Sequence, residues 1–412
     1  MENPKIRFKG FTKDWEQRKL GDIINEYKET VDSDCILPIL TSSKTEGVIL
    51  QEEHFGRKQQ HDITGYNILP RNYCTYRNRS DGVDFTFNIN KCCDKGIISK
   101  FYPVFSGKNS DVFFLSLVLN NSEEVVREIA YTCTGTGQKV LSFLDLQKMK
   151  VRVPNFDEQK EIAAYFESLD HLITLHQRKC DQTKNLKKYM LQKMFPQNGA
   201  KVPEIRFDGY TYDWEQRKLG ELVKEGILEA PLDGNHGEKH PTSDEYVDSG
   251  IPFLMASDIH NGEVNIYSCK YITKERAERL DKGFARNGDV LLTHKATIGE
   301  TAILSNLMTE YAMLTPQVTY YRIKNEERLN REYLYSFFNS LDFQTELKTK
   351  AAQSTRPYIG ITAQQNLKII LPAEINEQIR IGLYFRNLDH LITLHQRQTD
   401  FYKKPNFYFI SS

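Results

Sequence analysis

Side chains suited to binding a polyanion gather between Arg57 and Arg79. This stretch, RKQQHDITGYNILPRNYCTYRNR, has five lysine or arginine residues and one acidic residue. Lysine and arginine neutralise phosphates, arginine matches guanine, and asparagine and glutamine match adenine. A basic loop exposed to solvent is the simpler alternative. The candidate contacts are Arg57, Lys58, Gln59, Arg71, Asn72, Tyr76, Arg77, Asn78 and Arg79.

Two loops further along the chain carry polar tips at matching places. TGTGQK at 134–139 ends in Gln138 and Lys139, and it aligns with QSTRPY at 353–358. The second loop supplies Thr355, Arg356 and Tyr358 as candidates. Because binding residues are frequent on such loops, we predict nucleic-acid contact on both sides, with plain connecting turns as the alternative.

A further group of candidates lies between the two loops. THKAT at 293–297 contributes Thr293, His294, Lys295 and Thr297. Arg276 belongs to TKERAERLDK at 273–282, which equally fits an amphipathic surface helix with Glu and Arg paired along it.

Catalytic and metal-binding patterns are weak. Asp145, Glu158 and Lys160 imitate the D…ExK arrangement of metal-dependent nucleases, but the matching place in the second half reads Glu377-Gln378-Ile379 and lacks the lysine. TGTGQKV has no third glycine for a dinucleotide loop, and no NPPY-like tetrapeptide occurs. The seven cysteines form no CxxC pair. We therefore predict no catalytic residue and no metal site in this chain.

The elements that position these residues are repeated. DWEQRKLG at Asp14–Gly21 recurs at Asp213–Gly220, and LDHLITLHQR at Leu169–Arg178 recurs at Leu388–Arg397. The segments between the two repeated blocks, about 23–150 and 222–370, differ in length and in sequence. A constant frame around two variable inserts suits a scaffold that holds two modules with different targets.

Each half ends in a predicted long helix. From Asp157, taken as its N-cap, apolar residues recur with the alternating spacing of four and three that marks a helix-packing seam. Two such stripes on one chain would most simply pack on each other, antiparallel, about a pseudo-twofold axis. Pro405 predicts that the second helix is shortened. The seam residues are Ile162, Phe166, Leu169, Ile173 and His176, matched by Ile381, Phe385, Leu388, Ile392 and His395.

The inserts and the composition indicate a mixed α/β (α+β) protein. Short β-rich runs stand at 85–89, 97–105, 289–294 and 315–323, separated by turn residues. Apolar residues make up 39% of the 412 residues, and 55 Lys plus Arg balance 55 Asp plus Glu, so any basic surface must be local. No apolar run is long enough for a membrane span, and the N-terminus lacks the apolar core of a signal peptide. We expect a cytoplasmic protein without a membrane partner.

A resemblance to a known family rests on the two WEQRKLG segments, on the helix starts VRVPNFDEQKEIAAYFESLD and IILPAEINEQIRIGLYFRNLD, and on GDVLLTHKATIGETAIL at 288–304. In these stretches the chain resembles the specificity (S) subunit of Type I restriction-modification systems. The resemblance implies two globular target recognition domains, 1–155 and 197–374, each binding half of a split double-stranded DNA sequence. They would be separated by two long antiparallel helices, 156–196 and 375–412.

The same resemblance implies partners and chemistry outside this chain. Two methyltransferase subunits carrying S-adenosylmethionine would dock on the helices, restriction/translocase subunits would complete the complex, and this chain would bind no cofactor and catalyse nothing. A helical protein-interaction scaffold and a stand-alone Mg²⁺-dependent nuclease are the alternatives.

Overall fold

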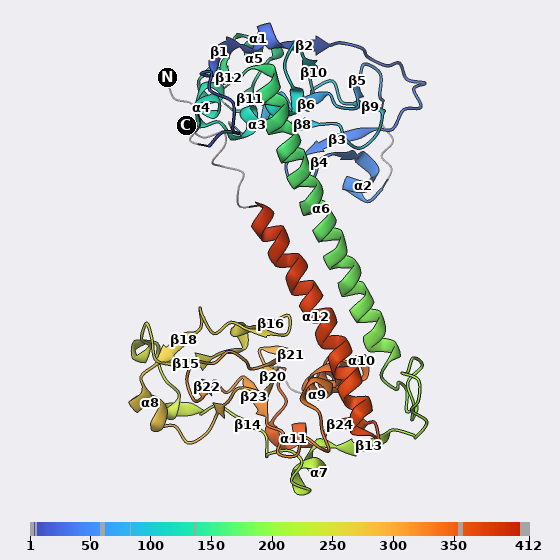
Figure 1. Ribbon diagram of the computed structural model, residues 1–412, viewed down its shortest axis with the longest axis vertical. Coiled ribbons are helices and arrows are strands. Elements are labelled where there is room, and N and C mark those ends of the chain that lie inside the picture. Colours follow the sequence, from blue (N-terminus) through green and yellow to red (C-terminus); the bar gives the residue numbers. More distant parts are fainter. Residues whose placement is uncertain are drawn as a thin grey trace. The chain divides into compact units, whose positions relative to one another are not determined.

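The computed structural model describes residues 4, 6–57, 62–82, 84–135, 137–352 and 357–403 (Figure 1). The chain forms two compact units. The first contains the residues up to His176 and those from Gln398 onward, and the second contains Gln177–Arg397. Each unit mixes helices and strands, which confirms the predicted fold class.

The elements of the first half, in chain order, are β1 (Glu16–Lys19), α1 (Leu20–Ile23), β2 (Ile24–Tyr27), β3 (Leu40–Ser43), β4 (Gly47–Leu50), α2 (Gln51–Phe55), β5 (Asn67–Pro70), β6 (Cys74–Tyr76), β7 (Arg79–Ser80), β8 (Phe87–Ile89), β9 (Lys95–Ile98), β10 (Val104–Gly107), α3 (Val112–Asn121), α4 (Glu123–Thr132), β11 (Lys139–Val140), α5 (Phe143–Lys148), β12 (Lys150–Val153) and α6 (Phe156–Lys193).

The elements of the second half are β13 (Glu215–Lys218), α7 (Leu219–Lys224), β14 (Leu232–Asp233), η1 (Gly237–Lys239), η2 (Ser243–Glu245), β15 (Ile251–Leu254), η3 (Ala256–Asp258), β16 (Ile259–His260), β17 (Glu263–Val264), β18 (Lys270–Ile272), α8 (Lys274–Glu278), β19 (Phe284–Ala285), β20 (Val290–Lys295), β21 (Thr297–Ile303), β22 (Ala312–Leu314), β23 (Val318–Tyr321), α9 (Arg331–Phe338), α10 (Leu341–Ala351), α11 (Ile361–Gln365), β24 (Lys368–Leu371) and α12 (Ile375–Lys403).

A short antiparallel ribbon closes each insert at its root. The repeated EQRK forms β1 in the first half and β13 in the second; β1 pairs with β12, and β13 with β24. The glycine that ends the repeat lies close to neighbouring backbone in both places. A Cβ on Gly21 would lie 3.1 Å from the Gln147 carbonyl oxygen, and one on Gly220 would lie 3.1 Å from that of Gln365. Identical sequence thus gives identical local structure.

A buried ion pair joins each opening segment to the start of its long helix. The Arg7 guanidinium donates to both carboxylate oxygens of Glu158, at 2.8 and 2.7 Å. Arg206 makes the same two bonds to Glu377, at 2.7 and 2.9 Å. Both glutamates are fully buried, so these bonds offset the cost of removing a carboxylate from water.

The inserts between these roots are built on different sheets. The first insert contains the four-stranded sheet β2-β10-β6-β8, packed against α3. The second contains the sheets β14-β23-β20-β21 and β18-β15-β22-β19, and β15 runs parallel to β22. Strands were predicted at 85–89, 97–105, 289–294 and 315–323, and β8, β9 with β10, β20 and β23 lie there.

One detail of the predicted helices was wrong. The N-cap of α6 is Asn155 rather than Asp157, because the Asn155 side chain accepts the Glu158 backbone N–H at 3.0 Å. The first part of each seam also packs into the core of its own domain. Ile162, Phe166 and Leu169 belong to the first core, and Ile381, Phe385 and Leu388 to the second. A domain this small gains much of its core from the helix that leaves it.

Contacts between α6 and α12 occur further along both helices. In the second unit, the Cys180 thiol lies 3.9 Å from the Ile392 carbonyl oxygen, and Lys187 pairs with Asp389 at 2.5 Å. Partners with rising numbers on α6 have falling numbers on α12, so the helices are antiparallel there. In the first unit, the rings of His176 and Tyr402 stack at 5.7 Å. Ile173, Ile392 and His395 are half-buried.

None of the helices in the described parts of the chain combines the length and the apolar character that a membrane crossing requires.

Candidate nucleic-acid interface

In the first domain, the structure joins two stretches that were predicted separately. The strand β7 pairs with β11, so Arg79 lies opposite Val140 and Ser80 opposite Lys139. The Arg79 guanidinium covers the exposed ring of Phe101 at 4.5 Å. The loop that carries Gln138 therefore returns beside the basic strand. Cations with an exposed aromatic ring at one edge are the features expected of a nucleic-acid contact.

The other candidates of the first domain have different surroundings. Arg57 is exposed after α2, and Arg77 is exposed after β6. Arg71 pairs with the exposed Asp94 at 2.8 Å, and Asn72 has a positive φ of 63° and accepts from Lys91. Lys58 and Gln59 lie outside the described residues.

Tyr76 does not fit the predicted role. Its side chain is fully buried, and its hydroxyl donates to the Leu141 carbonyl at 3.1 Å. Every residue of β6 is buried, so Tyr76 belongs to the core and holds the returning segment in place.

In the second domain, the hairpin β20–β21 ends in an exposed basic tip. Lys295 and Thr297 are exposed on either side of Ala296, and Lys295 forms a bridge with Tyr358. The ring of Tyr358 is 38% exposed. These three candidates form a second basic and aromatic edge, while Thr355 and Arg356 lie outside the described residues.

Thr293 and His294 do not fit direct contact with DNA, because both side chains are fully buried. The strand β20 is covered on both faces, and all of its residues from Val290 to His294 are buried. The Thr293 hydroxyl accepts the Glu300 N–H, and His294 Nδ1 donates to the Ile359 carbonyl at 3.0 Å. They support the tip instead of forming its surface.

The two edges occupy the same place in the two domains. In the first, the Leu141 N–H donates to the Asn78 carbonyl, and Arg79 follows. In the second, the Ile359 N–H donates to the His294 carbonyl, and Lys295 follows. Both returning segments lead directly into a short helix, α5 or α11, and then into the root strand. The domains therefore present different side chains at equivalent positions.

Arg276 fits the alternative of a surface helix. Its guanidinium pairs with Glu245 and donates to the Lys239 carbonyl. The hydrogen bond from Arg276 lowers the pKa of Glu245 to about 2. The charge of Arg276 is thus neutralised by an acidic neighbour, which weakens its case as a phosphate contact.

The nuclease alternative fails on geometry. Glu158 is buried against Arg7, and the Asp145 carboxylate accepts from Ser142 and Lys148. Lys160 pairs with Asp157. In the parts of the chain that the structure describes, no group of three or more His, Cys, Asp or Glu side chains is placed to hold a metal ion.

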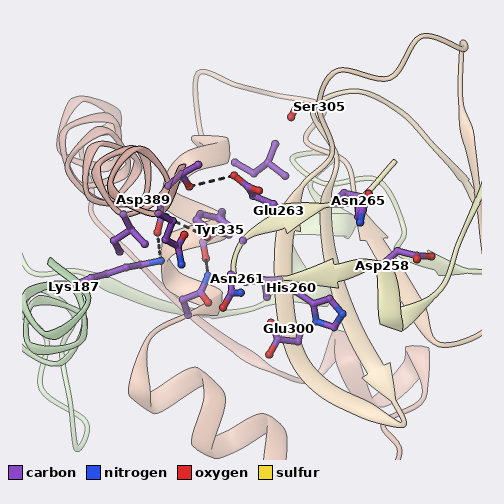
Figure 2. Close-up of a pocket in the computed structure, with 18 of the residues that line it drawn as sticks. Lys187, Asp258, His260, Asn261, Glu263, Asn265, Glu300, Ser305, Tyr335 and Asp389 are labelled. Atoms are coloured by element: carbon purple, nitrogen blue, oxygen red, sulfur yellow. Dashed lines mark hydrogen bonds and ion pairs between the residues drawn. The ribbon is translucent and has the colours of Figure 1, made fainter. Parts of the chain in front are cut away.

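A cleft of about 870 Å³ in the second unit runs between the long helices and β16–β17. Figure 2 shows Lys187 and Asp389 pointing toward each other across it, with Tyr335 beside them. The Tyr335 hydroxyl donates to Asp389 at 3.2 Å, and Thr393 donates to Glu263 at 3.2 Å. These two bonds fasten the second domain to α12, and the Lys187–Asp389 pair joins α12 to α6.

One polar cluster escaped the sequence-based prediction. Asp233 is buried in the second domain, accepts from His236 and Lys282, and faces His294. Lys282 stands 49 positions after Asp233, so the pairing could be found only in the fold. The one local signal is the DGNH turn at 233–236, where an acid precedes a glycine.

Comparison with known proteins agrees with this architecture. The family model described as Type I restriction modification DNA specificity domain matches residues 12–185 and 212–400. The Type I restriction enzyme MjaVIII specificity subunit of Methanocaldococcus jannaschii is 24% identical over 74% of this chain and 70% of its own length. The EcoBI specificity subunit of Escherichia coli is 24% identical over 59% of this chain and 52% of its own.

Two solved structures share the fold. The S subunit of a Type I restriction-modification system from M. genitalium covers 99% of this chain and 98% of its own, with a TM-score of 0.64 and 12% identity. A chain from a study of complex assembly and conformational transition of the type I R-M system covers 97% of each, with a TM-score of 0.50 and 18% identity. The family match spans both repeated halves, and the chain therefore belongs to the Type I restriction-modification DNA specificity family, whose members are DNA-recognition subunits without catalytic activity of their own.

Proposed function

We propose that this chain selects a bipartite DNA target, one half through each recognition domain, and that it docks two methyltransferase subunits. One observation carries the proposal: the repeated frame holds two equivalent basic edges with different side chains. Arg79 and Lys139 stand at the first edge, and Lys295 and Tyr358 at the second. Two modules that read different sequences on one scaffold need this combination of constant position and variable chemistry.

The docking surface is argued from repeated apolar exposure on the long helices. Leu175 is 36% exposed and Leu394 is 39% exposed, at matching positions of LDHLITLHQR. Large apolar side chains left in solvent twice at the same place favour two copies of one protein partner. In this proposal the partners bind S-adenosylmethionine and methylate adenines flipped out of the two half-sites. Restriction/translocase subunits would then supply the motor and the nuclease.

The test is to purify the chain with its cognate methyltransferase subunit and to map methylated adenines across a genome. We expect a motif of two fixed half-sites with a constant gap. A formed complex that methylates nothing would contradict sequence recognition, and the lack of any complex would contradict the docking.

Matched variants separate the two parts of the proposal. Arg79→Gln is expected to weaken or relax one half-site, and Lys295→Gln the other. Leu175→Glu combined with Leu394→Glu is expected to reduce binding of the methyltransferase subunit at least tenfold in a pull-down titration. The control is Met308→Glu, because Met308 is 95% exposed and lies between β21 and β22 of the second domain, outside the long helices.

A further inference from the structure

We infer that Asp233, His236, Lys282 and His294, here called the Asp233 cluster, form the base-reading site of the second recognition domain, with guanine as the base that it reads. The inference rests on the proposed function, because it names residues that would give one half-site its specificity. Asp233 and His294 act as positioning residues, and His236 and Lys282 contact the DNA.

Asp233 lies at the centre of the cluster and is 1% exposed. Its Oδ2 accepts from His236 Nε2 at 2.8 Å, and its Oδ1 accepts from Lys282 Nζ. Burial alone would raise the pKa of Asp233, but the hydrogen bonds from Lys282 and His236 outweigh it and lower that pKa. The carboxylate therefore stays charged and holds two donors in fixed positions.

The backbone around Asp233 allows little movement. A Cβ on Gly234 would lie 1.8 Å from the Leu314 carbonyl oxygen, so only glycine fits beside the aspartate. Asn235 is 5% exposed; its side chain donates to the Lys282 carbonyl and accepts the Asp281 N–H. The loop that carries Lys282 is thus tied directly to the DGNH turn.

His294 connects the cluster to the exposed tip of β20–β21. Its Nδ1 donates to Ile359, so Nε2 is the unprotonated acceptor. Nε2 is buried, has no hydrogen-bond partner, and lies 4.0 Å from Asp233 Oδ2. A buried acceptor without a partner is rare in folded proteins and requires an explanation, such as a functional role. The ring of His294 also lies 5.6 Å from the ring of Tyr358.

The first domain has a related feature at the equivalent place. Asn78 precedes Arg79 as His294 precedes Lys295, and Asn78 Oδ1 is also buried without a hydrogen-bond partner. Backbone strain adds a second sign in the second domain: Ala296, at the tip, has a positive φ of 67°. Strained backbone and unsatisfied buried polar atoms concentrate at functional sites.

The surface above Asp233 presents a lysine donor, the Nδ1 acceptor of His236 and an aromatic ring. The side chain of His236 is 49% exposed and that of Lys282 is 32% exposed, and Lys295 and Tyr358 lie along the same edge through His294. In the major groove, guanine is the base with two adjacent acceptors, O6 and N7, and lysine is one of its usual partners. The lysine donor held by a buried carboxylate therefore suits a guanine better than an adenine or a thymine, and the His236 Nδ1 suits the amino group of the paired cytosine.

The experiment is the methylation map, repeated with complexes that contain Lys282→Met or His236→Gln. We expect a G·C pair in the half-site read by the second domain, and we expect each variant to relax that position at least tenfold while the other half-site is unchanged. The matched control is Lys239→Met, since Lys239 is an exposed lysine of the same domain that pairs with the exposed Asp281. Thermal denaturation confirms that each variant is folded.

The outcomes separate the inference from the proposed function. A wild-type complex without a bipartite motif would refute the proposed function. A clear wild-type motif that both variants retain, with or without a uniform drop in methylation, would overturn the inference and leave the proposed function standing. The inference also fails if the second half-site contains no G·C pair.

Discussion

Removing the charge of Glu377 is expected to destabilise the second domain by about 2–3 kcal/mol. Glu377 is 1% exposed and accepts two short bonds from Arg206. Breaking one side of a buried pair costs about 3–5 kcal/mol. Glu377→Gln keeps one carbonyl acceptor, and Arg206 keeps its bond to the Tyr212 carbonyl and some contact with water, which reduces the loss.

The assay is denaturant unfolding followed by tryptophan fluorescence. The chain has two tryptophans, one in each core, so a Trp15→Phe background leaves Trp214 to report on the second domain. The control is Glu278→Gln, because the Lys274–Glu278 pair is exposed and is worth about 0.5 kcal/mol or less. A loss for Glu377→Gln as small as that of the control would refute the reasoning.

Three further expectations concern His294, Glu245 and Phe195. Burial lowers the pKa of His294 from 6.5 to about 4; the charge of Asp233 acts against this shift, and the charges of His236 and Lys295 add to it. The protein is therefore fully stable above about pH 6.5, and its free energy of unfolding falls by up to ~3 kcal/mol toward pH 4. The denaturation midpoint of His294→Gln should not show this pH dependence. The hydrogen bond from Arg276 lowers the pKa of Glu245 from 4.5 to about 2. The ion pair therefore stabilises the fold above about pH 4.5, and this stabilisation is lost toward pH 2. Glu245→Gln should remove that pH dependence from the denaturation midpoint. Phe195→Ala should cost about 3–5 kcal/mol in urea unfolding, because Phe195 is 2% exposed among four aromatic rings, whereas Ala in place of the exposed Leu186 should cost little.

The frame was predictable because its determinants are local and repeated. The two EQRK strands and the two long helices follow from identical sequence and from helical spacing, and β20 and β23 follow from apolar runs. The N-cap was misplaced by two residues because Asn155 and Asp157 both suit that position.

Contacts between distant residues were not predictable in this way. Nothing near Arg79 in the sequence indicates that it lies opposite Val140, and the partners of Asp233 come from separate loops. The direction in which a side chain points was also not predictable from the sequence. Tyr76 is buried whereas its neighbour Arg77 is exposed. The strand β20 is buried on both faces from Val290 to His294, so burial does not alternate along it.

The paired strands at the base of each domain, β1 with β12 and β13 with β24, also affect how the domains can be exchanged between genes. Because β1 and β12 are paired, the two ends of the first insert stand one strand spacing apart, about 4.8 Å. Any foreign insert whose ends meet at that spacing can be grafted there without disturbing the ribbon or the Arg7–Glu158 pair. Under the proposed function, a single genetic exchange would then replace a whole half-site, and the DNA sequence recognised would change in one step instead of base by base.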